Sequence, residues 1–487
     1  MREALDPTRS RAAAARMTAQ GTVMLLWALL LGATIAAVVT LAGPEAGLLL
    51  ALALVAAFAA ARMPGVVLAA LVLVPFYKAA IQPYIPVDIT AVLAGLNALQ
   101  VVPVLRDHRP RSWSNSGLVL WCAFGLLLLA GVLHAPDQQL SLGAVAGFWG
   151  LVIVPITPAA LRCASDPRHV RQFLWTVFIV GVVVVVLGMT QLLDGTSTGS
   201  APLVVLGANT IAVGRAALLV PLLGLTFVLR SRTAVARVSM AILTPAAFIV
   251  AVASGSRGPL LVLLALGGLG LLDHIARPRR RDWRPVTVLG GAALATLVMT
   301  IGSGLLPVQS VQRFAIFAGF VEGAVSSTPA ASPADTSSEA RMQLFGVALT
   351  MFEERPILGW GVSAFATMSP TLLGTAAGDT YPHNAVLQVA AESGLAGLFL
   401  LIGLVSLALT RRLPRGPAGI VRLLFLFFFL NAMVSGDILQ DRMTWALLML
   451  LLVADAAPTS EEEPTLVPVL TPTRSPGARH SSRWIHA

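Results

Sequence analysis

Long apolar stretches separated by short basic loops constrain this chain more than any other feature. They recur from about residue 22 to residue 455, and most are long enough to cross the ~30 Å hydrocarbon core of a bilayer as a helix. In lipid each backbone polar group needs a partner within its own segment, so each stretch is predicted to be a helix. The predicted helices lie near 22–42, 46–62, 65–82, 88–105, 117–134, 141–161, 171–193, 210–229, 238–255, 258–273, 285–306, 384–410, 418–435 and 440–455. The expected fold is an all-α polytopic transmembrane bundle of about 12–14 spans, with one long outer loop that contains short helices.

The composition supports a membrane protein and argues against a nucleic-acid partner. Hydrophobic residues make up 56% of the chain and charged residues only 11%, whereas soluble domains carry about 25% charged residues. The net charge of +10 comes from Arg residues spread over many loops rather than gathered in one patch. The lipid bilayer is therefore the expected surroundings, and no nucleic acid is expected.

The distribution of basic residues predicts the orientation of the chain. Cytoplasmic loops of membrane proteins are enriched in Lys and Arg. With the N-terminus inside and alternating spans, all but seven of the 33 basic residues fall on the inner side. The seven outer ones are Lys78, Arg215, Arg257, Arg313, Arg341, Arg355 and Arg442. Both termini are thus predicted to be cytoplasmic.

Five regions follow from this topology. They are a cytoplasmic N-terminal segment at 1–21, eleven spans within 22–306, an extracytoplasmic loop at 307–382, three spans within 383–456, and a disordered cytoplasmic tail at 457–487. Within the long loop, residues 340–354 are predicted to form a helix that Pro356 ends. Residues 359–365 are predicted to form a turn after it, and the segment could lie on the outer leaflet or cap a cavity.

A polar stripe opens the predicted helix at 384–410. Asn384, Gln388 and Glu392 are spaced four apart and share one helix face, and His383 lies at the first turn. The N-terminus of a helix favours an anion, and polar groups at membrane depth mark polar cavities or pathways. The same residues are also compatible with a structural role, with His383 as a cap and the others as interhelical hydrogen-bond partners or as an ion pair of Glu392 with a buried Arg.

Three outer arginines add a candidate anion site. Arg257 lies in a tight turn, while Arg215 and Arg341 lie in or beside predicted helices on the same side. The planar guanidinium matches phosphate oxygens in pairs, so two or three of them suit a pyrophosphate, and Lys78 could add a point charge. Snorkelling toward the interface is the alternative explanation for each cation.

Several functional classes lack their motifs here. The chain has no P-loop, no Cys/His cluster or His-Glu-x-x-His sequence, no outer Asp-x-Asp pattern and no outer hydrolase elbow. No ATP-driven pumping, no metal and no cofactor are therefore expected.

Three motifs resemble the bacterial O-antigen ligase and O-antigen polymerase superfamily. They are Ser254-Gly255-Ser256-Arg257-Gly258, the segment from Arg341 through 356–361 to Phe365, and His383-Asn384 followed by Leu387-Gln388, Glu392-Ser393-Gly394 and Gly397. The order, the spacing and the long loop before the His match over about residues 205–410, whereas the first two hundred residues match only as generic spans. Fourteen spans would exceed the twelve of some ligases.

The resemblance implies a metal-independent glycosyltransferase in the bacterial cytoplasmic (inner) membrane, with its site facing outward. It would move a glycan from a polyprenyl-diphosphate carrier, such as undecaprenyl diphosphate, to a hydroxyl of a glycan, lipid or protein acceptor in cell-envelope polysaccharide or lipopolysaccharide synthesis. By this resemblance, His383 and Arg257 would be catalytic, with His383 accepting the hydroxyl proton or helping to hold the diphosphate. Arg215, Arg341, Lys78, Asn384 and Gln388 would bind substrate. Ligase and polymerase share these motifs, so both stay open. A flippase for the same lipid-linked sugar and a structural partner in a glycan-assembly complex are the alternatives from other classes.

Overall fold

The computed structural model describes residues 62–107, 116–194, 203–230, 234–276, 336–374, 380–411 and 417–453. The helices predicted near 22–42, 46–62 and 285–306, the N-terminal segment, most of the loop before residue 336 and the C-terminal tail lie outside these ranges. Within them, every regular element is helical, which confirms the all-α fold class.

The described helices follow one another with short connections. Their bounds are α3 Pro64–Ile81, η1 Gln82–Tyr84, α4 Ile89–Ala98, α5 Val101–Asp107, α6 Ser116–Gly131, η3 Val132–His134, α7 Gln138–Phe148, η4 Trp149–Ile153, α8 Val154–Ala164, α9 Pro167–Leu193, α10 Thr210–Arg230, α11 Ala234–Ala253, α12 Arg257–Ala276, α15 Thr336–Glu354, α16 Ala364–Leu373, α17 Ala385–Thr410, α18 Pro417–Ser435 and α19 Arg442–Val453.

Seven helical segments in the described ranges are long and apolar enough to cross a membrane. They are Pro64–Tyr84, Ile89–Arg106, Ser116–His134, Gln138–Ala164, Pro167–Leu193, Ala234–Ala253 and Ala385–Thr410. The helix predicted at 141–161 is a continuous segment in which a π-helical turn, Trp149–Ile153, joins α7 to α8. The helix predicted at 88–105 is divided near Leu99 into α4 and α5. The chain is a multi-pass helical membrane protein.

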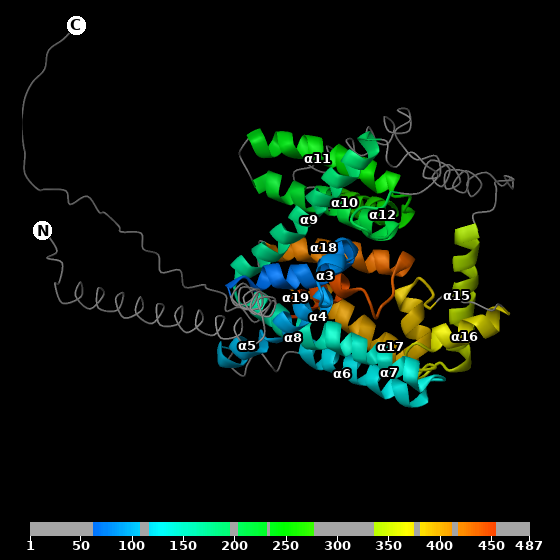
Figure 1. Cartoon of the computed structure of the whole chain (residues 1–487). Helices are drawn as coiled ribbons and strands as arrows, with labels where there is room; N and C mark the ends of the chain where they lie inside the picture. Colours follow the sequence, from blue (N-terminus) through cyan, green and yellow to red (C-terminus); the bar gives the residue numbers. More distant parts are fainter. Residues whose placement is uncertain are drawn as a thin grey trace, which may run out of the picture.

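The bundle is built around a short central helix. Figure 1 shows α19 and α3 in the middle, α10, α11 and α12 on one side, and α6 and α7 on the other. All side chains from Met443 to Val453 in α19 are buried, as expected for a helix that is hydrophobic all round. At one end of α19, Arg411 donates a hydrogen bond to the carbonyl oxygen of Leu452, and Arg422 donates one to the carbonyl oxygen of Arg411. Both arginines were predicted to be cytoplasmic.

Aromatic packing holds the other end of α19 in place. The Trp445 ring lies 5.1 Å from Trp121, 5.3 Å from Phe124 and 5.6 Å from Phe148, between ring centroids. These spacings are typical of favourable aromatic pairs. The indole Nε1 of Trp445 donates to the carbonyl oxygen of Ile438 at 2.6 Å. The loop that precedes α19 is therefore tied to the rigid core.

Helix α17 is kinked at Gly394, where an outer loop inserts. Gly394 has φ 61° and ψ −155°, a conformation essentially limited to glycine. The loop supplies the backbone hydrogen bonds that the kink frees: Leu395 N to Pro356 O at 2.7 Å, Ala396 N to Ile357 O at 3.1 Å, Trp360 N to Ala391 O at 3.0 Å and Gly361 N to Glu392 O at 2.9 Å. Irregular backbone is tolerated in a membrane bundle where protein satisfies it in this way. Two motifs that are separate in the sequence thus form one structural unit.

The helices of the long loop pack on α17. Leu344, Val347, Ala348 and Met351 of α15 form a small core with Ala391 of α17. The predicted end of this helix before Pro356 is confirmed, since α15 ends at Glu354. The positive φ angles at Gly359 and Gly361 fit the predicted turn. The turn ends earlier than predicted, because residues 364 and 365 already begin α16.

Candidate functional site

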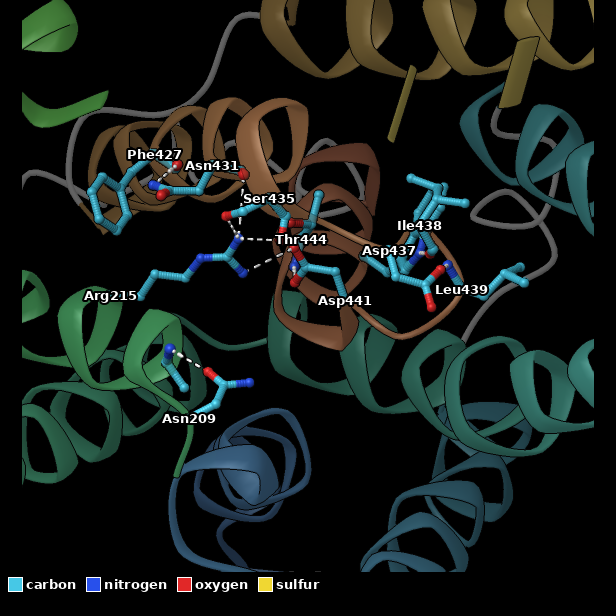
Figure 2. A network of polar contacts seen from close by, with 12 residues as sticks. Asn209, Arg215, Phe427, Asn431, Ser435, Asp437, Ile438, Leu439, Asp441 and Thr444 are labelled. Carbon is cyan, nitrogen blue, oxygen red and sulfur yellow. Dashed lines mark hydrogen bonds and ion pairs between the residues drawn. The ribbon is translucent and has the colours of Figure 1, made fainter. Parts of the chain in front are cut away.

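Polar side chains gather around the loop at 436–441, which joins α18 to α19. Arg215, near the start of α10, reaches this loop (Figure 2). Its Nη2 donates to Asn431 O at 3.2 Å and to Ser435 Oγ at 3.3 Å, and its Nη1 lies 3.7 Å from an Asp441 carboxylate oxygen. The side chains of Arg215 and Asp441 are only 12% and 9% exposed. A buried charge needs such compensation, which excludes simple snorkelling of Arg215 to water.

The Arg215 guanidinium keeps one buried donor unused. Its Nε has no hydrogen-bond partner among the described residues, although it is shielded from solvent. A buried unpaired donor costs about 1–3 kcal/mol. Such a group is suited to an incoming anion.

The Arg257 turn packs against both α10 and α18. Ser254 is fully buried, its Oγ donates to Ala251 O at 2.7 Å, and Gly255 takes a positive φ of 70°. A Cβ built on Gly214, the neighbour of Arg215, would lie 3.1 Å from Ser254 Oγ. A Cβ on Gly258 would lie 3.8 Å from Ser435 Oγ and 3.9 Å from Asn431 Oδ1, the two residues that Arg215 contacts. The structure thus brings the turn that carries Arg257 to the same end of α18 as Arg215.

His383 lies on the segment that leads into α17. It has a left-handed φ of 55°, which is uncommon for a residue with a side chain. Its ring packs against Tyr381 with 4.4 Å between ring centroids. Arg215 interacts electrostatically with Tyr381. Tyr381 therefore lies against His383 and within electrostatic range of Arg215, although 168 positions separate His383 from Arg215 in the chain.

Gln388 ties α17 to the loop before α19. It is 2% exposed, its Nε2 donates to Asp437 Oδ1 at 3.1 Å, and its Oε1 accepts from Ile438 N at 2.9 Å. Both ends of the amide are thus used within the protein. Burial raises the pKa of Asp437, and hydrogen bonds from Leu439 and Gln388 oppose the rise.

Two residues of the polar stripe have structural contacts. Asn384 caps α17, because its Oδ1 accepts from Val386 N at 3.0 Å and from Leu387 N at 3.1 Å. The carboxylate of Glu392 accepts a hydrogen bond from Phe365 N at 3.4 Å and a second from the Ser363 backbone. Glu392 therefore holds the start of α16, instead of pairing with an arginine as one interpretation of the sequence had it.

Lys78 and Arg341 lie farther from these contacts along the chain. The Lys78 ammonium pairs with Asp88 at 2.5 Å, and hydrogen bonding from Lys78 lowers the Asp88 pKa. Asp88 also caps α4 through Thr90 N at 2.7 Å. Arg341 is half-buried on α15, one turn before Leu344, whose side chain belongs to the small core on α17.

Sequence reasoning missed the acidic half of the site. It gave no role to Asn431, Ser435, Asp437 or Asp441, and it found no usable pattern at Arg442. Asp437 and Asp441 are four residues apart in a short loop between apolar helices. That spacing, together with a membrane arginine in need of a counter-charge, was the available signal.

A cavity of about 730 Å³ opens beside this loop. Gln388, Asp437, Gln440 and Arg442 line it from one side, and α7 lines it from another. Its volume lies within the usual range for ligand sites. Among the residues that the structure describes, no group of three or more His, Cys, Asp or Glu side chains is arranged to hold a metal ion.

Comparison with known proteins places a third of the chain in a family. Searches of curated proteins and of solved structures gave no match. Residues 240–402 match the family model described as O-antigen ligase. This segment contains the Arg257 turn, α15, the kinked start of α17 and His383. Over these residues, the match confirms the resemblance to the O-antigen ligase and polymerase superfamily that was drawn from the motifs.

Proposed function

We propose that the protein transfers a glycan from a polyprenyl-diphosphate carrier to an acceptor hydroxyl at the outer face of the bacterial inner membrane. The family match over residues 240–402 supports a membrane protein of the O-antigen ligase or polymerase type. The donor, the acceptor and the reaction are our inference. A ligase and a polymerase would differ only in the acceptor, so the chemistry below applies to both.

The observation that carries the proposal is the convergence of three distant segments at the end of α18. Arg215 docks on Asn431, Ser435 and Asp441, and the Arg257 turn packs on the same residues of α18. Gln388, which follows His383 at the start of α17, hydrogen-bonds Asp437 in the loop after α18. The two arginines and the histidine that these segments carry suit a reaction whose leaving group is a diphosphate and whose nucleophile must lose a proton.

In the proposed reaction, the acceptor hydroxyl oxygen attacks the anomeric carbon and forms the new glycosidic bond. The bond between that carbon and the diphosphate oxygen breaks, and its electron pair leaves with the polyprenyl diphosphate. Arg257 and Arg215 stabilise the negative charge that grows on the diphosphate, with Arg341 as a further candidate. His383 takes the proton of the attacking hydroxyl, because an imidazole with a reference pKa of about 6.5 suits a base near neutral pH.

Arg215 can serve this role only if its surroundings leave donors for the diphosphate. Its Nη2 is held by α18, whereas its Nε is unused and its Nη1 faces Asp441 at the long distance of 3.7 Å. An incoming phosphate oxygen would therefore bind at Nε, and Nη1 could donate to a different oxygen of the diphosphate. Asp441 would keep the guanidinium oriented in the absence of substrate. The proposed steps use only side chains of this chain and no metal.

The test compares single variants of the full-length protein in nanodiscs with a polyprenyl-diphosphate oligosaccharide, an acceptor extract and EDTA. Arg257→Ala and Arg215→Ala should each lower the transfer rate by roughly 10²–10³. His383→Ala should lower it by roughly 10²–10⁴. The matched control is Arg355→Ala, which removes another predicted outer arginine, whose Cζ lies 3.8 Å from the centroid of the Trp360 ring. It should keep the wild-type rate.

Equal rates in wild type, His383→Ala and Arg257→Ala would contradict these roles. Transport of the lipid-linked glycan across reconstituted vesicles without any release of carrier would replace the transferase with a flippase.

A further inference from the structure

The loop at 436–441 lines the cavity and also contacts Arg215. Figure 2 shows Arg215 and Asp441 at one end of the loop, and Asp437 and Leu439 at the other. Asp437 and Leu439 line the cavity, whereas neither Arg215 nor Asp441 does. The cavity and the proposed diphosphate site are therefore neighbours that share one loop but present different side chains.

The polar part of the cavity suits uncharged hydroxyl groups. Its polar lining includes Asp137 and Gln139 at the start of α7, together with Thr380, Asp437 and Gln440. Amides, hydroxyls and carboxylates bind sugar hydroxyls as donors and acceptors. Two carboxylates at this end would repel a diphosphate.

The cation in the lining offers a donor to a ligand. Arg442 interacts electrostatically with Asp88, and its Nη1 has no hydrogen-bond partner among the described residues. A neutral hydroxyl oxygen can accept from this Nη1 without adding charge. A diphosphate would add about two further negative charges beside Asp137 and Asp437, which is unfavourable.

The rest of the cavity is an apolar stripe on α7 and the π-helical turn. Leu140, Gly143, Ala144, Gly147 and Leu151 follow helical spacing and all line the cavity. A Cβ built on Gly143 or on Gly147 would meet nothing within 4 Å. The two glycines leave space along the helix that a side chain would fill. The stripe therefore offers room for an apolar chain below the polar end.

We propose that this cavity binds the acceptor, an amphipathic molecule with an uncharged, hydroxyl-bearing sugar head and an apolar tail. The head lies at Asp437, Gln440 and Arg442, next to the loop that borders the diphosphate site, and the tail lies along Gly143 and Gly147. As an acceptor site it rests on the proposed transferase function, but occupation of the cavity by a neutral glycolipid can be tested without turnover.

Photo-crosslinking of the full-length protein in nanodiscs tests occupation directly. The probe is dodecyl β-glucoside with a diazirine in its alkyl chain, and mass spectrometry maps the adducts. Wild type should be labelled on the lining stripe of α7. Unlabelled dodecyl β-glucoside should abolish the labelling by competition, whereas undecaprenyl diphosphate should not.

Cavity-filling variants supply the matched comparison. Gly143→Leu and Gly147→Leu place a side chain in the cavity and should remove the labelling. Gly150→Leu is the control, because Gly150 also faces open space but does not line the cavity. It should label as wild type does. Size-exclusion elution of all three should match wild type, since leucine favours a helix more than glycine does.

Three labelling outcomes would overturn the proposal: no labelling of α7 in wild type, labelling that persists in Gly147→Leu, or competition by undecaprenyl diphosphate. The last outcome would assign the cavity to the donor lipid. In the transfer assay with the glucoside as acceptor, Gly143→Leu and Gly147→Leu should raise the acceptor KM at least about tenfold and leave the donor KM unchanged. A raised donor KM would also contradict the proposal. Absence of transfer in wild type, with labelling as expected, would refute the proposed reaction and leave the glycolipid site standing.

Discussion

Replacing Gly394 with alanine should separate the outer loop from α17. Gly394 occupies a backbone conformation that residues with a side chain rarely adopt. A Cβ there would lie 2.5 Å from both the carbonyl carbon and the oxygen of Ile357, and 2.7 Å from Gly359 N. These are backbone atoms, so no change of rotamer can relieve the clash. The loop must move, or α17 must straighten.

The cost can be worked out from the contacts. Strain at the substituted residue is on the order of 1–3 kcal/mol. Moving the loop also breaks the four backbone hydrogen bonds between residues 356–361 and 391–396, each worth about 1 kcal/mol net. Because the clash with backbone atoms forces the loop away from α17, the four lost hydrogen bonds set the cost, and we expect a loss of about 4 kcal/mol in the free energy of unfolding. Because Glu392 holds the start of α16, the outer helices should loosen as well.

Denaturant unfolding in mixed micelles, followed by Trp fluorescence, measures this loss. Gly403→Ala is the matched control on the same helix, because its Cβ would meet only Leu120 Cδ1 at an ordinary 3.6 Å. It should be neutral or slightly stabilising, since alanine favours a helix by up to about 1 kcal/mol. Hydrogen exchange at Trp360 N and Gly361 N should rise in Gly394→Ala only. Equal unfolding midpoints for Gly394→Ala and wild type, with unchanged exchange, would refute the account of the kink.

Four further outcomes follow from single contacts. Asp441→Asn leaves the Arg215 charge without its buried partner and should destabilise the protein by about 3–5 kcal/mol in denaturant unfolding, with a raised donor KM. The free energy of unfolding of Asp437→Asn should rise relative to that of wild type as pH rises above the ordinary Asp pKa of about 3.9. The reason is that the pKa of Asp437 is raised in the folded state, so wild type loses stability as this buried carboxyl ionises, whereas the amide does not ionise. Lys78→Met should be less stable than wild type at neutral pH. That gap should close as pH falls below about 4, because the pKa of Asp88 is lowered by Lys78 and the stabilisation is lost on protonation. Arg355→Ala should lose about 0.5–1 kcal/mol of stability through its cation–π contact with Trp360 and keep full transfer activity.

The membrane fold was predictable because a long apolar segment in lipid must satisfy its backbone hydrogen bonds within the segment, which leaves the helix as the expected structure. The helices at 65–82, 171–193 and 384–410 were predicted to within a few residues of α3, α9 and α17. The kink at Gly394 was not predicted. A lone glycine in an apolar run does not show that a distant loop will fill the break.

The site was predictable in its cations and not in its counter-charges. Arg215, Arg257 and His383 stand out as ionisable residues near helix ends, and the structure places the segments that carry them around the end of α18. Asp437 and Asp441 depend on tertiary contacts across 49 or more positions, which no local pattern encodes. Asn384 was predicted to bind substrate, and in the structure its Oδ1 caps α17. An Asn at the start of a helix suits both roles, so the sequence does not distinguish them.

The most direct measurement is the stoichiometry of carrier release and glycan transfer by the purified wild-type protein. A radiolabelled polyprenyl-diphosphate oligosaccharide is supplied with an acceptor and EDTA, and free polyprenyl diphosphate and newly joined glycan are counted together. The account predicts one carrier released for each glycan transferred, with both signals lost in His383→Ala and Arg257→Ala and retained in Arg355→Ala. No carrier release by wild type, or equal release by all four proteins, would contradict it.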